Sequence, residues 1–137
     1  MERIRGGIIL GGLPGRLRHA RINSIVMDET KMEYEKAVDL YGQGKREEAI
    51  KAFLEIIAKN PKFSDAYETL GMIYYKQGRL DEAIEWTDKL AELRPDYAMA
   101  HTNLSIFYMK KGMKEKAEEE KAKATVLNFT NISKAKP

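Results

Sequence analysis

The chain has 137 residues, of which 43% are hydrophobic and 33% charged, a composition that suits one small helical domain with a solvated outer face. It contains no cysteine, which excludes disulfides and thiolate metal sites, and no apolar run approaches the roughly 20 residues that cross a bilayer. The net charge is +3, but five Arg and one Glu in residues 1–27 alone contribute +4, so we expect no nucleic-acid partner for the nearly neutral remainder.

The first 28 residues differ in composition from the rest of the chain. Five of the ten glycines lie between residues 6 and 15, together with Pro14, and this density opposes both helix and strand. The apolar run Ile8–Leu10 is shorter than the roughly 7–15 residues of a secretory signal core. We therefore expect residues 1–28 to be a disordered basic extension. An organellar transit peptide, or a protein start at Met27, stays open as an alternative.

From residue 29 to residue 129 the sequence repeats itself every 34 residues. Glycine and alanine recur once in each of three units, and leucine, tyrosine and proline recur in two of them. These positions are Gly44, Gly78, Gly112, Ala49, Ala83, Ala117, Leu70, Leu104, Tyr74, Tyr108, Pro61 and Pro95. A fixed step of this length indicates one structural unit copied along the chain, here as units 30–63, 64–97 and 98–129.

Each unit carries apolar stripes at helical spacing on both sides of its glycine, which predicts two helices joined by a tight turn. The second unit shows this most clearly, since its first stripe ends before Gly78 and Pro95 stops its second helix. The first unit departs from this pattern, because Glu33 and Lys36 stand at apolar positions. The free side of its first helix is therefore expected to face water.

The third unit is expected to end the array. Its second helix carries Glu118 and Lys121 at positions where the second unit is uncharged, and a charged face cannot bury a further repeat. The acidic run Glu118–Glu120 is typical of a solvated helix face. Residues 130–137 are short and basic, and we expect this tail to fray.

The second unit resembles the tetratricopeptide repeat, whose pattern is W-x2-L-G-x2-Y, then A-x3-F, then P. The matching residues are Leu70, Gly71, Tyr74, Ala83 and Pro95, with Tyr67 in the Trp position and Thr87 in the Phe position. The resemblance implies an all-α fold, a right-handed helical solenoid of antiparallel helix pairs with three tandem repeats. The small side chains of Gly71 and Ala83 would let the two helices of a pair approach closely.

In this family the first helix of each unit lines a concave groove, and the resemblance maps two apolar rows onto it. One row is Val38, Met72 and Ile106, the other is Tyr41, Tyr75 and Met109, and the flanking polar residues include Tyr34, Thr69 and Asn103. We expect the groove to bind an apolar or amphipathic segment of a partner protein. Among the positions that grip a C-terminal carboxylate in one family subgroup, only Asn103 matches in kind, so such a clamp is not expected. Whether the rows face the groove or the core stays open.

No arrangement of residues indicates catalysis. His19 and His101 share no motif with each other or with a carboxylate, so we expect no metal, no cofactor and no enzymatic activity. His101 takes the Trp position of its unit and is interpreted as a packing substitute. The sequence therefore predicts a cytoplasmic protein–protein interaction module or scaffold. The alternative is a subunit that self-assembles into weak homo-oligomers through its repeat ends.

Overall fold

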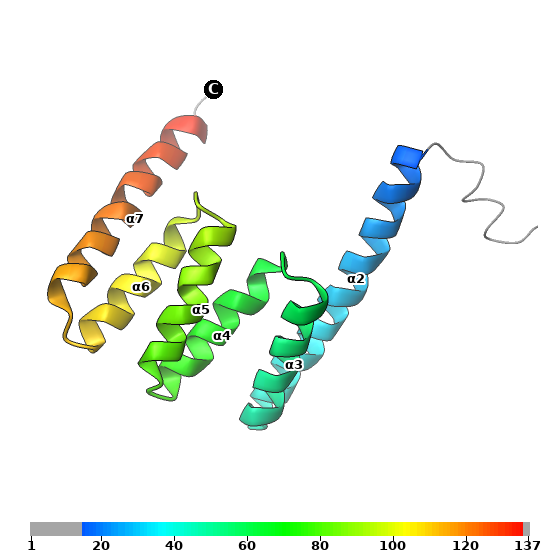
Figure 1. The fold of residues 1–137 in the computed structure, drawn as a ribbon, viewed down its shortest axis with the longest axis horizontal. Helices are drawn as coiled ribbons and strands as arrows, with labels where there is room; N and C mark the ends of the chain where they lie inside the picture. The colour runs from blue at the N-terminus through cyan, green and yellow to red at the C-terminus, as the bar shows by residue number, and fades with distance from the viewer. Residues whose placement is uncertain (1–14, 136–137) are drawn as a thin grey trace, which may run out of the picture.

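The computed structural model describes residues 15–135, with side chains from Ile25 to Lys134. Within this range the chain forms six helices and no strand (Figure 1). They are α2 (Gly15–Gly42), α3 (Arg46–Lys59), α4 (Ser64–Lys76), α5 (Leu80–Leu93), α6 (Ala98–Lys110) and α7 (Lys114–Ala135). The chain is an all-α helical solenoid, as the periodic sequence predicts.

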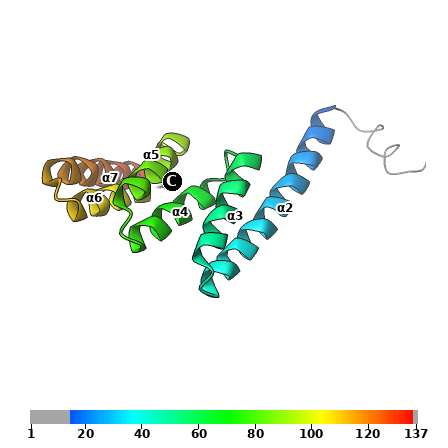
Figure 2. The same ribbon diagram turned by 60° about the horizontal axis from the view of Figure 1, so that its bottom comes forward.

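The helices pair into three antiparallel hairpins, α2–α3, α4–α5 and α6–α7, which lie side by side in chain order across Figure 1. The same order is seen when the molecule is turned by 60° (Figure 2). Each helix makes its main contacts with the helices directly before and after it in the sequence. In such an array a hairpin is stabilised by its neighbours, so each terminal hairpin of the described chain has an open side.

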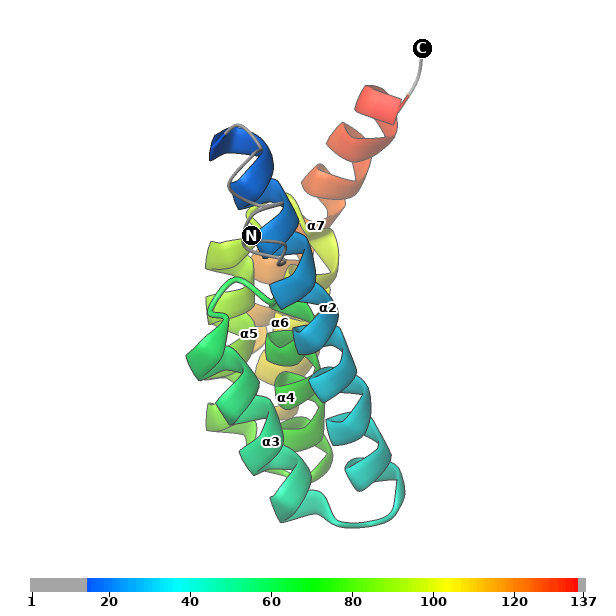
Figure 3. The same ribbon diagram turned by 90° about the vertical axis from the view of Figure 1, so that its right-hand side faces the viewer.

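The two terminal helices are the longest and extend beyond the array at the same edge. α2 has 28 residues and α7 has 22, against 13 or 14 in each of the four helices between them. The N-terminal part of α2 and the C-terminal part of α7 both lie at the upper edge of Figure 1, and the end-on view shows their tips leaning apart (Figure 3). Despite this length, no helix of the described residues has an apolar stretch that could cross a membrane.

Both ends of the described chain are more helical than the sequence suggests. α2 begins at Gly15, so the disorder expected over residues 1–28 is wrong for residues 15–28. The reason is that neither glycine nor proline occurs between Arg16 and Tyr41, so nothing there interrupts helical hydrogen bonding. Residues 1–14 of the expected extension lie outside the described residues. The tail expected to fray from residue 130 is helical up to Ala135.

Each hairpin turns at an equivalent glycine. The φ angles of Gly44, Gly78 and Gly112 are +83°, +77° and +84°, in the left-handed region that side chains resist. In every turn the N–H of the next residue donates to the carbonyl of the fifth residue before it. These bonds are Lys45 to Leu40 at 3.0 Å, Arg79 to Tyr74 at 2.9 Å and Met113 to Tyr108 at 2.9 Å. The same helix cap is therefore built three times, which explains why glycine keeps its spacing.

Small residues set the distance between the two helices of a hairpin. Ala49, Ala83 and Ala117 are fully buried. A Cβ atom placed on Gly71 would lie 2.5 Å from Thr87 Oγ1 and 3.6 Å from the carbonyl oxygen of Ala83. The expectation that Gly71 and Ala83 permit close helix approach is therefore confirmed.

The other recurring residues divide between the core and the turns. Leu70, Leu104 and Tyr74 are buried, Tyr108 is half-buried, and Pro61 and Pro95 are exposed in the turns that follow α3 and α5. The positions that recur are thus those at which either the interior or a chain reversal restricts the choice of residue.

Candidate functional site

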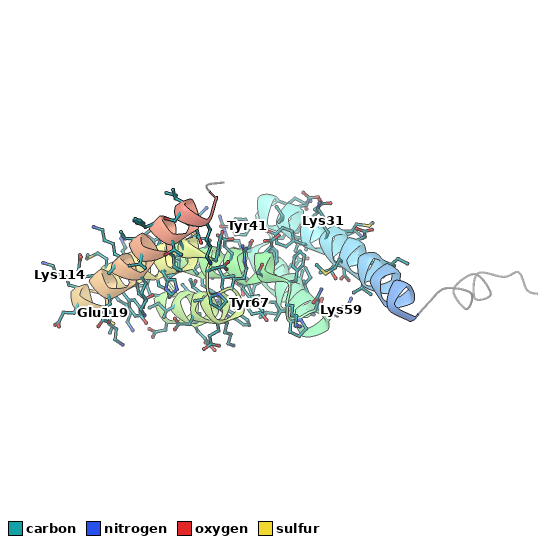
Figure 4. The ribbon with its side chains drawn as sticks, turned by 90° about the horizontal axis from the view of Figure 1, so that it is seen from above. Lys31, Tyr41, Lys59, Tyr67, Lys114 and Glu119 are labelled. Atoms are coloured by element: carbon teal, nitrogen blue, oxygen red, sulfur yellow. The ribbon has the colours of Figure 1, made fainter. Side chains whose placement is uncertain are left out.

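The two predicted rows lie on the first helix of each hairpin, α2, α4 and α6, and none of their six side chains is buried. Val38, Ile106 and Met109 are between 41% and 49% exposed. The other three, Tyr41, Met72 and Tyr75, are half-buried. Seen from above, Tyr41 and the core residue Tyr67 lie on opposite sides of the array (Figure 4). The first helices thus present a broken apolar strip that solvent reaches.

Side-chain contacts join the three first helices beneath this strip. The ring of Tyr75 on α4 stacks on the ring of Phe107 on α6, with centroids 4.8 Å apart and planes inclined by 29°. The hydroxyl groups of Tyr34 on α2 and Thr69 on α4 share a hydrogen bond of 2.7 Å. These contacts fix the rows relative to one another, so a segment that binds across them meets a preformed surface.

The flanking polar residues are less available than the rows. Tyr34 and Thr69 direct their hydroxyl groups at each other, and the Tyr34 ring also packs edge-on against Phe63 with centroids 5.5 Å apart. Asn103 is only 9% exposed. These three residues are therefore engaged within the array or largely buried, and the apolar side chains of the rows are the more exposed feature of the first helices.

A pocket of about 750 Å³ opens between α6 and α7 at the C-terminal end of the rows. Three row residues line it, namely Tyr75, Ile106 and Met109. The remaining lining residues are Thr102, Ser105 and Lys110 of α6 and Glu118, Lys121, Ala124, Thr125 and Asn128 of α7. Two lysines against one glutamate give the pocket a positive balance, which favours ligands with negative charge beside apolar surface.

The α7 side of this pocket was not predicted as a site. The repeat register, in which equivalent positions lie 34 residues apart in successive units, could have revealed it. Ala124 of α7 stands at the register position of Leu90 of α5, and Leu90 is buried in one cluster with Ala100 of α6. No described helix follows α7, so the surface that a next repeat would cover is open on the last one.

On a different face of α7, Glu120 joins His101 of α6 and Lys123. His101 Nδ1 lies 2.7 Å from Glu120 Oε1, and Lys123 Nζ donates to Glu120 Oε2 at 2.9 Å. Burial by itself raises the pKa of Glu120, but the hydrogen bonds with His101 and Lys123 outweigh it and hold the pKa below its ordinary value. No group of three or more His, Asp or Glu side chains in the described residues is arranged to hold a metal ion.

This cluster corrects two interpretations of the sequence. Glu120 is only 9% exposed, so the solvated face expected for residues 118–120 is wrong at this position. His101 does more than fill the space of an aromatic residue, because it ties α6 to α7 through a polar contact. The two residues are 19 apart in the chain, and no local pattern brings them together.

Residues 34–98 match a family model described as tetratricopeptide repeat. The match runs from the C-terminal half of α2 to the start of α6 and contains the second unit in full. This chain is a tetratricopeptide-repeat (TPR) protein. No curated protein sequence matches it.

The TPR protein is also similar to several solved structures. A crystal structure of MamA shares 26% sequence identity with a TM-score of 0.72, over 76% of this chain and 61% of the MamA chain. SycD, the type III secretion translocator chaperone of Yersinia enterocolitica, shares 25% identity with a TM-score of 0.70, over 79% and 81%. The second TPR of Spaghetti (RPAP3), bound to an HSP90 peptide, shares 19% identity with a TM-score of 0.65, over 72% and 91%. The chain thus spans less than two thirds of MamA, and the likeness to RPAP3 shows the fold alone.

Proposed function

We propose that this TPR protein is a non-enzymatic interaction module that binds an apolar or amphipathic segment of a partner protein. The segment lies in the concave groove formed by three repeats, residues 30–63, 64–97 and 98–129. The observation that carries this proposal is the pair of apolar rows, which occupy equivalent positions on three first helices without being buried. A protein rarely keeps such a strip in water unless another molecule covers it.

The solved relatives support the proposal in a limited way. The second TPR of Spaghetti (RPAP3) is bound to an HSP90 peptide, and SycD has been solved with a peptide of the translocator YopD. These chains share 19% and 23% identity with this one, so they establish only that this fold accommodates peptides. The partner of this TPR protein is defined by the chemistry of its own groove.

The groove offers modest affinity from each contact. Complete burial of one aliphatic side chain is worth about 1.5–3 kcal/mol. The side chains of Val38, Ile106 and Met109 are a little under half exposed to solvent. Covering one of them with a partner should therefore contribute about 1 kcal/mol to the free energy of binding. Truncating one of them to alanine should therefore weaken binding about five-fold. The pocket between α6 and α7 adds a recess that a bulky apolar side chain of the partner can fill.

The test compares captured partners for the wild-type chain and a groove variant. The variant combines Val38→Glu, Ile106→Glu and Met109→Glu, which place three charges on the most exposed row residues. Because these side chains are already in contact with solvent, the fold should be retained, and circular dichroism checks the helical content. Proteins captured from a native lysate are then quantified by mass spectrometry.

A matched control carries the same three charges away from the groove. It combines Leu54→Glu, Ala58→Glu and Ala122→Glu, all at exposed positions on α3 and α7. A partner that is held by the wild type and the control but lost by the groove variant supports the proposal. A partner held equally by all three chains would show that the rows do not form the binding surface.

A further inference from the structure

The two ends of the array expose apolar side chains that the groove does not explain. On α2 these are Ile25, Val26, Met27 and Met32, which are 44–58% exposed. On α7 they are Val126, Phe129 and Ile132, which are 62–64% exposed. Both sets lie on the two longest helices, whose overhanging parts extend beyond the array at the same edge (Figure 1).

The internal junctions of the array show what each end lacks. α4 packs on α3, and α6 packs on α5, so each hairpin receives the first helix of the next hairpin on its own second helix. α7 is a second helix that no described helix follows, and α2 is a first helix that no described helix precedes. Within residues 15–135, α7 therefore presents a surface of the kind that accepts a first helix, and α2 is a first helix that packs on no preceding second helix.

We propose that these ends bind each other between two copies of the chain. α2 of one copy docks on the α6–α7 hairpin of a second copy, in the place that a fourth repeat would occupy. The two surfaces differ, so the association is head to tail and produces open chains or closed rings. It needs no other protein, but it uses the pocket beside Ile106 and Met109 that the proposed function offers to a partner, so a second copy and a partner would compete there.

Side-chain size supports this pairing. Inside the chain, the large Leu90 on α5 and the small Ala100 on α6 share one buried cluster. In the repeat register Leu90 corresponds to Ala124 on α7, and Ala100 corresponds to Met32 on α2. At the internal junction the second helix supplies the large residue and the first helix the small one. Between copies the first helix supplies the large Met32 and the second helix the small Ala124, so the combined side-chain volume is similar. Met32 is 58% exposed, and Ala124, although only 5% exposed, lines the pocket that Met32 would fill.

Charge supports the same pairing. At helical spacing, the face of α2 that carries Met32 also carries four exposed carboxylates and a single lysine. These residues are Asp28, Glu29, Glu35, Asp39 and Lys36. The pocket on α6 and α7 has the opposite balance, with Lys110 and Lys121 against Glu118. An acidic helix thus faces a basic recess, which favours the encounter and disfavours the docking of two identical ends. The charged face of α7 that was expected to end the array would therefore exclude an uncharged helix but accept this acidic one.

The overhanging parts of the two helices complete the interface. A first helix runs antiparallel to the second helix before it, so the N-terminal part of α2 lies beside the C-terminal part of α7. Ile25 shares the docking face of α2 with Met32, and Ile132 shares the face of α7 with Lys121, by helical spacing. At 1.5 Å per residue α7 is about 33 Å long. One helix laid along that length buries less than the roughly 1,200–2,000 Å² of a stable complex, so association should be weak.

The first test is the mass of the full chain in solution, measured by light scattering from about 10 μM to about 1 mM. We expect the average mass to start at 15.7 kDa, the mass of one chain, and to rise by about 1.5-fold or more over this range. Added salt should reduce the rise, because the interface is charged. A constant mass of 15.7 kDa would overturn the proposal and leave a partner protein as the occupant of the open end.

Two variants and their mixture test the head-to-tail arrangement. The first carries Ile25→Lys and Met32→Lys on α2, and the second carries Lys121→Glu and Ile132→Glu on α7, all at exposed positions. Each variant retains one intact end, so each alone should remain at the mass of one chain. Mixed in equal amounts they should form a heterodimer of twice that mass, because the intact α7 face of the first accepts the intact α2 of the second.

The remaining outcomes separate the alternatives. A control with Leu54→Glu and Ala58→Glu on α3 should associate as the wild type does. If one end variant alone associates as the wild type does, the contact joins two copies of the end that this variant keeps intact, and the head-to-tail arrangement is wrong. If both variants and their mixture are monomeric, the intact α7 face of one does not accept the intact α2 of the other, and the proposal is equally overturned. Circular dichroism of each variant verifies that the helices are intact.

Discussion

Helices α4 and α5 approach closely at Gly71, and substitution to alanine tests this packing directly. Gly71 is buried in the middle of α4. A Cβ atom there would lie 2.5 Å from Thr87 Oγ1 and 3.9 Å from Thr87 Cβ on α5. Thr87 is 1% exposed, so its hydroxyl is enclosed by neighbouring atoms. The new methyl group therefore has to displace the Thr87 side chain within a filled core or push α4 and α5 apart.

Two effects of opposite sign decide the result of Gly71→Ala. Alanine is favoured over glycine in a helix interior by about 1 kcal/mol. Overpacking of a filled core costs about 1–3 kcal/mol, and a contact of 2.5 Å belongs at the upper part of that range. We expect a net loss of about 1–2 kcal/mol in the free energy of unfolding. For a chain of this size the midpoint of thermal unfolding should then fall by about 3–10 °C.

The assay is urea and thermal unfolding followed by circular dichroism, with two companion variants. Gly42→Ala is the control, because nothing lies within 4 Å of a Cβ at this position, and it should leave stability unchanged or raise it slightly. Thr87→Ala removes the obstructing hydroxyl, so the double variant should be more stable than the sum of the two single effects predicts. The third hairpin already carries a side chain at this register, Ser105, opposite Lys121 in place of Thr87.

The reasoning would be refuted by a Gly71→Ala chain as stable as the wild type. It would equally be refuted if the effects of Gly71→Ala and Thr87→Ala simply add, because the predicted clash joins those two residues.

Three further predictions concern single side chains. Gly78→Ala should lower the free energy of unfolding in urea by about 1 kcal/mol, because its φ of +77° strains a side chain although nothing lies within 4 Å; unchanged stability would contradict this. Tyr34→Phe should cost about 1 kcal/mol through the lost hydrogen bond to Thr69, and a chain already lacking the Thr69 hydroxyl should show no such loss. The pKa of Glu120 in the folded chain lies below that of a free glutamate. Its carboxylate therefore stabilises the fold above the ordinary glutamate pKa, and this contribution is lost as the pH falls through the lowered pKa of the folded chain. Glu120→Gln should therefore flatten the acid side of the stability profile measured by urea unfolding between about pH 3 and pH 7, and an unaltered profile would show that the contact with His101 contributes nothing.

Part of the candidate site was predictable because it follows from the repeat. The register that places Val38, Met72 and Ile106 in one row requires only that equivalent positions of equivalent helices face the same way. The exposed fraction of each of these side chains depends on the neighbouring hairpins, and the existence of the pocket beside Ile106 depends on them too. From the sequence, the α7 residues that line this pocket indicate only a charged end of the array. The pattern of one helix by itself does not show that its side chains and those of α6 enclose a pocket.

The periodic sequence by itself determined the three turns and the pairing of the helices between them. The requirements there are local: Gly44, Gly78 and Gly112 supply a backbone angle that other residues resist, and flanking stripes at helical spacing define the faces that pack. Only the tertiary structure decided the contact of His101 with Glu120 and the exposure of the terminal helices. The contact joins the two helices of one hairpin at positions that the repeat pattern does not specify. The exposure arises where a terminal hairpin has no described neighbour to cover it, which a repeating sequence does not signal.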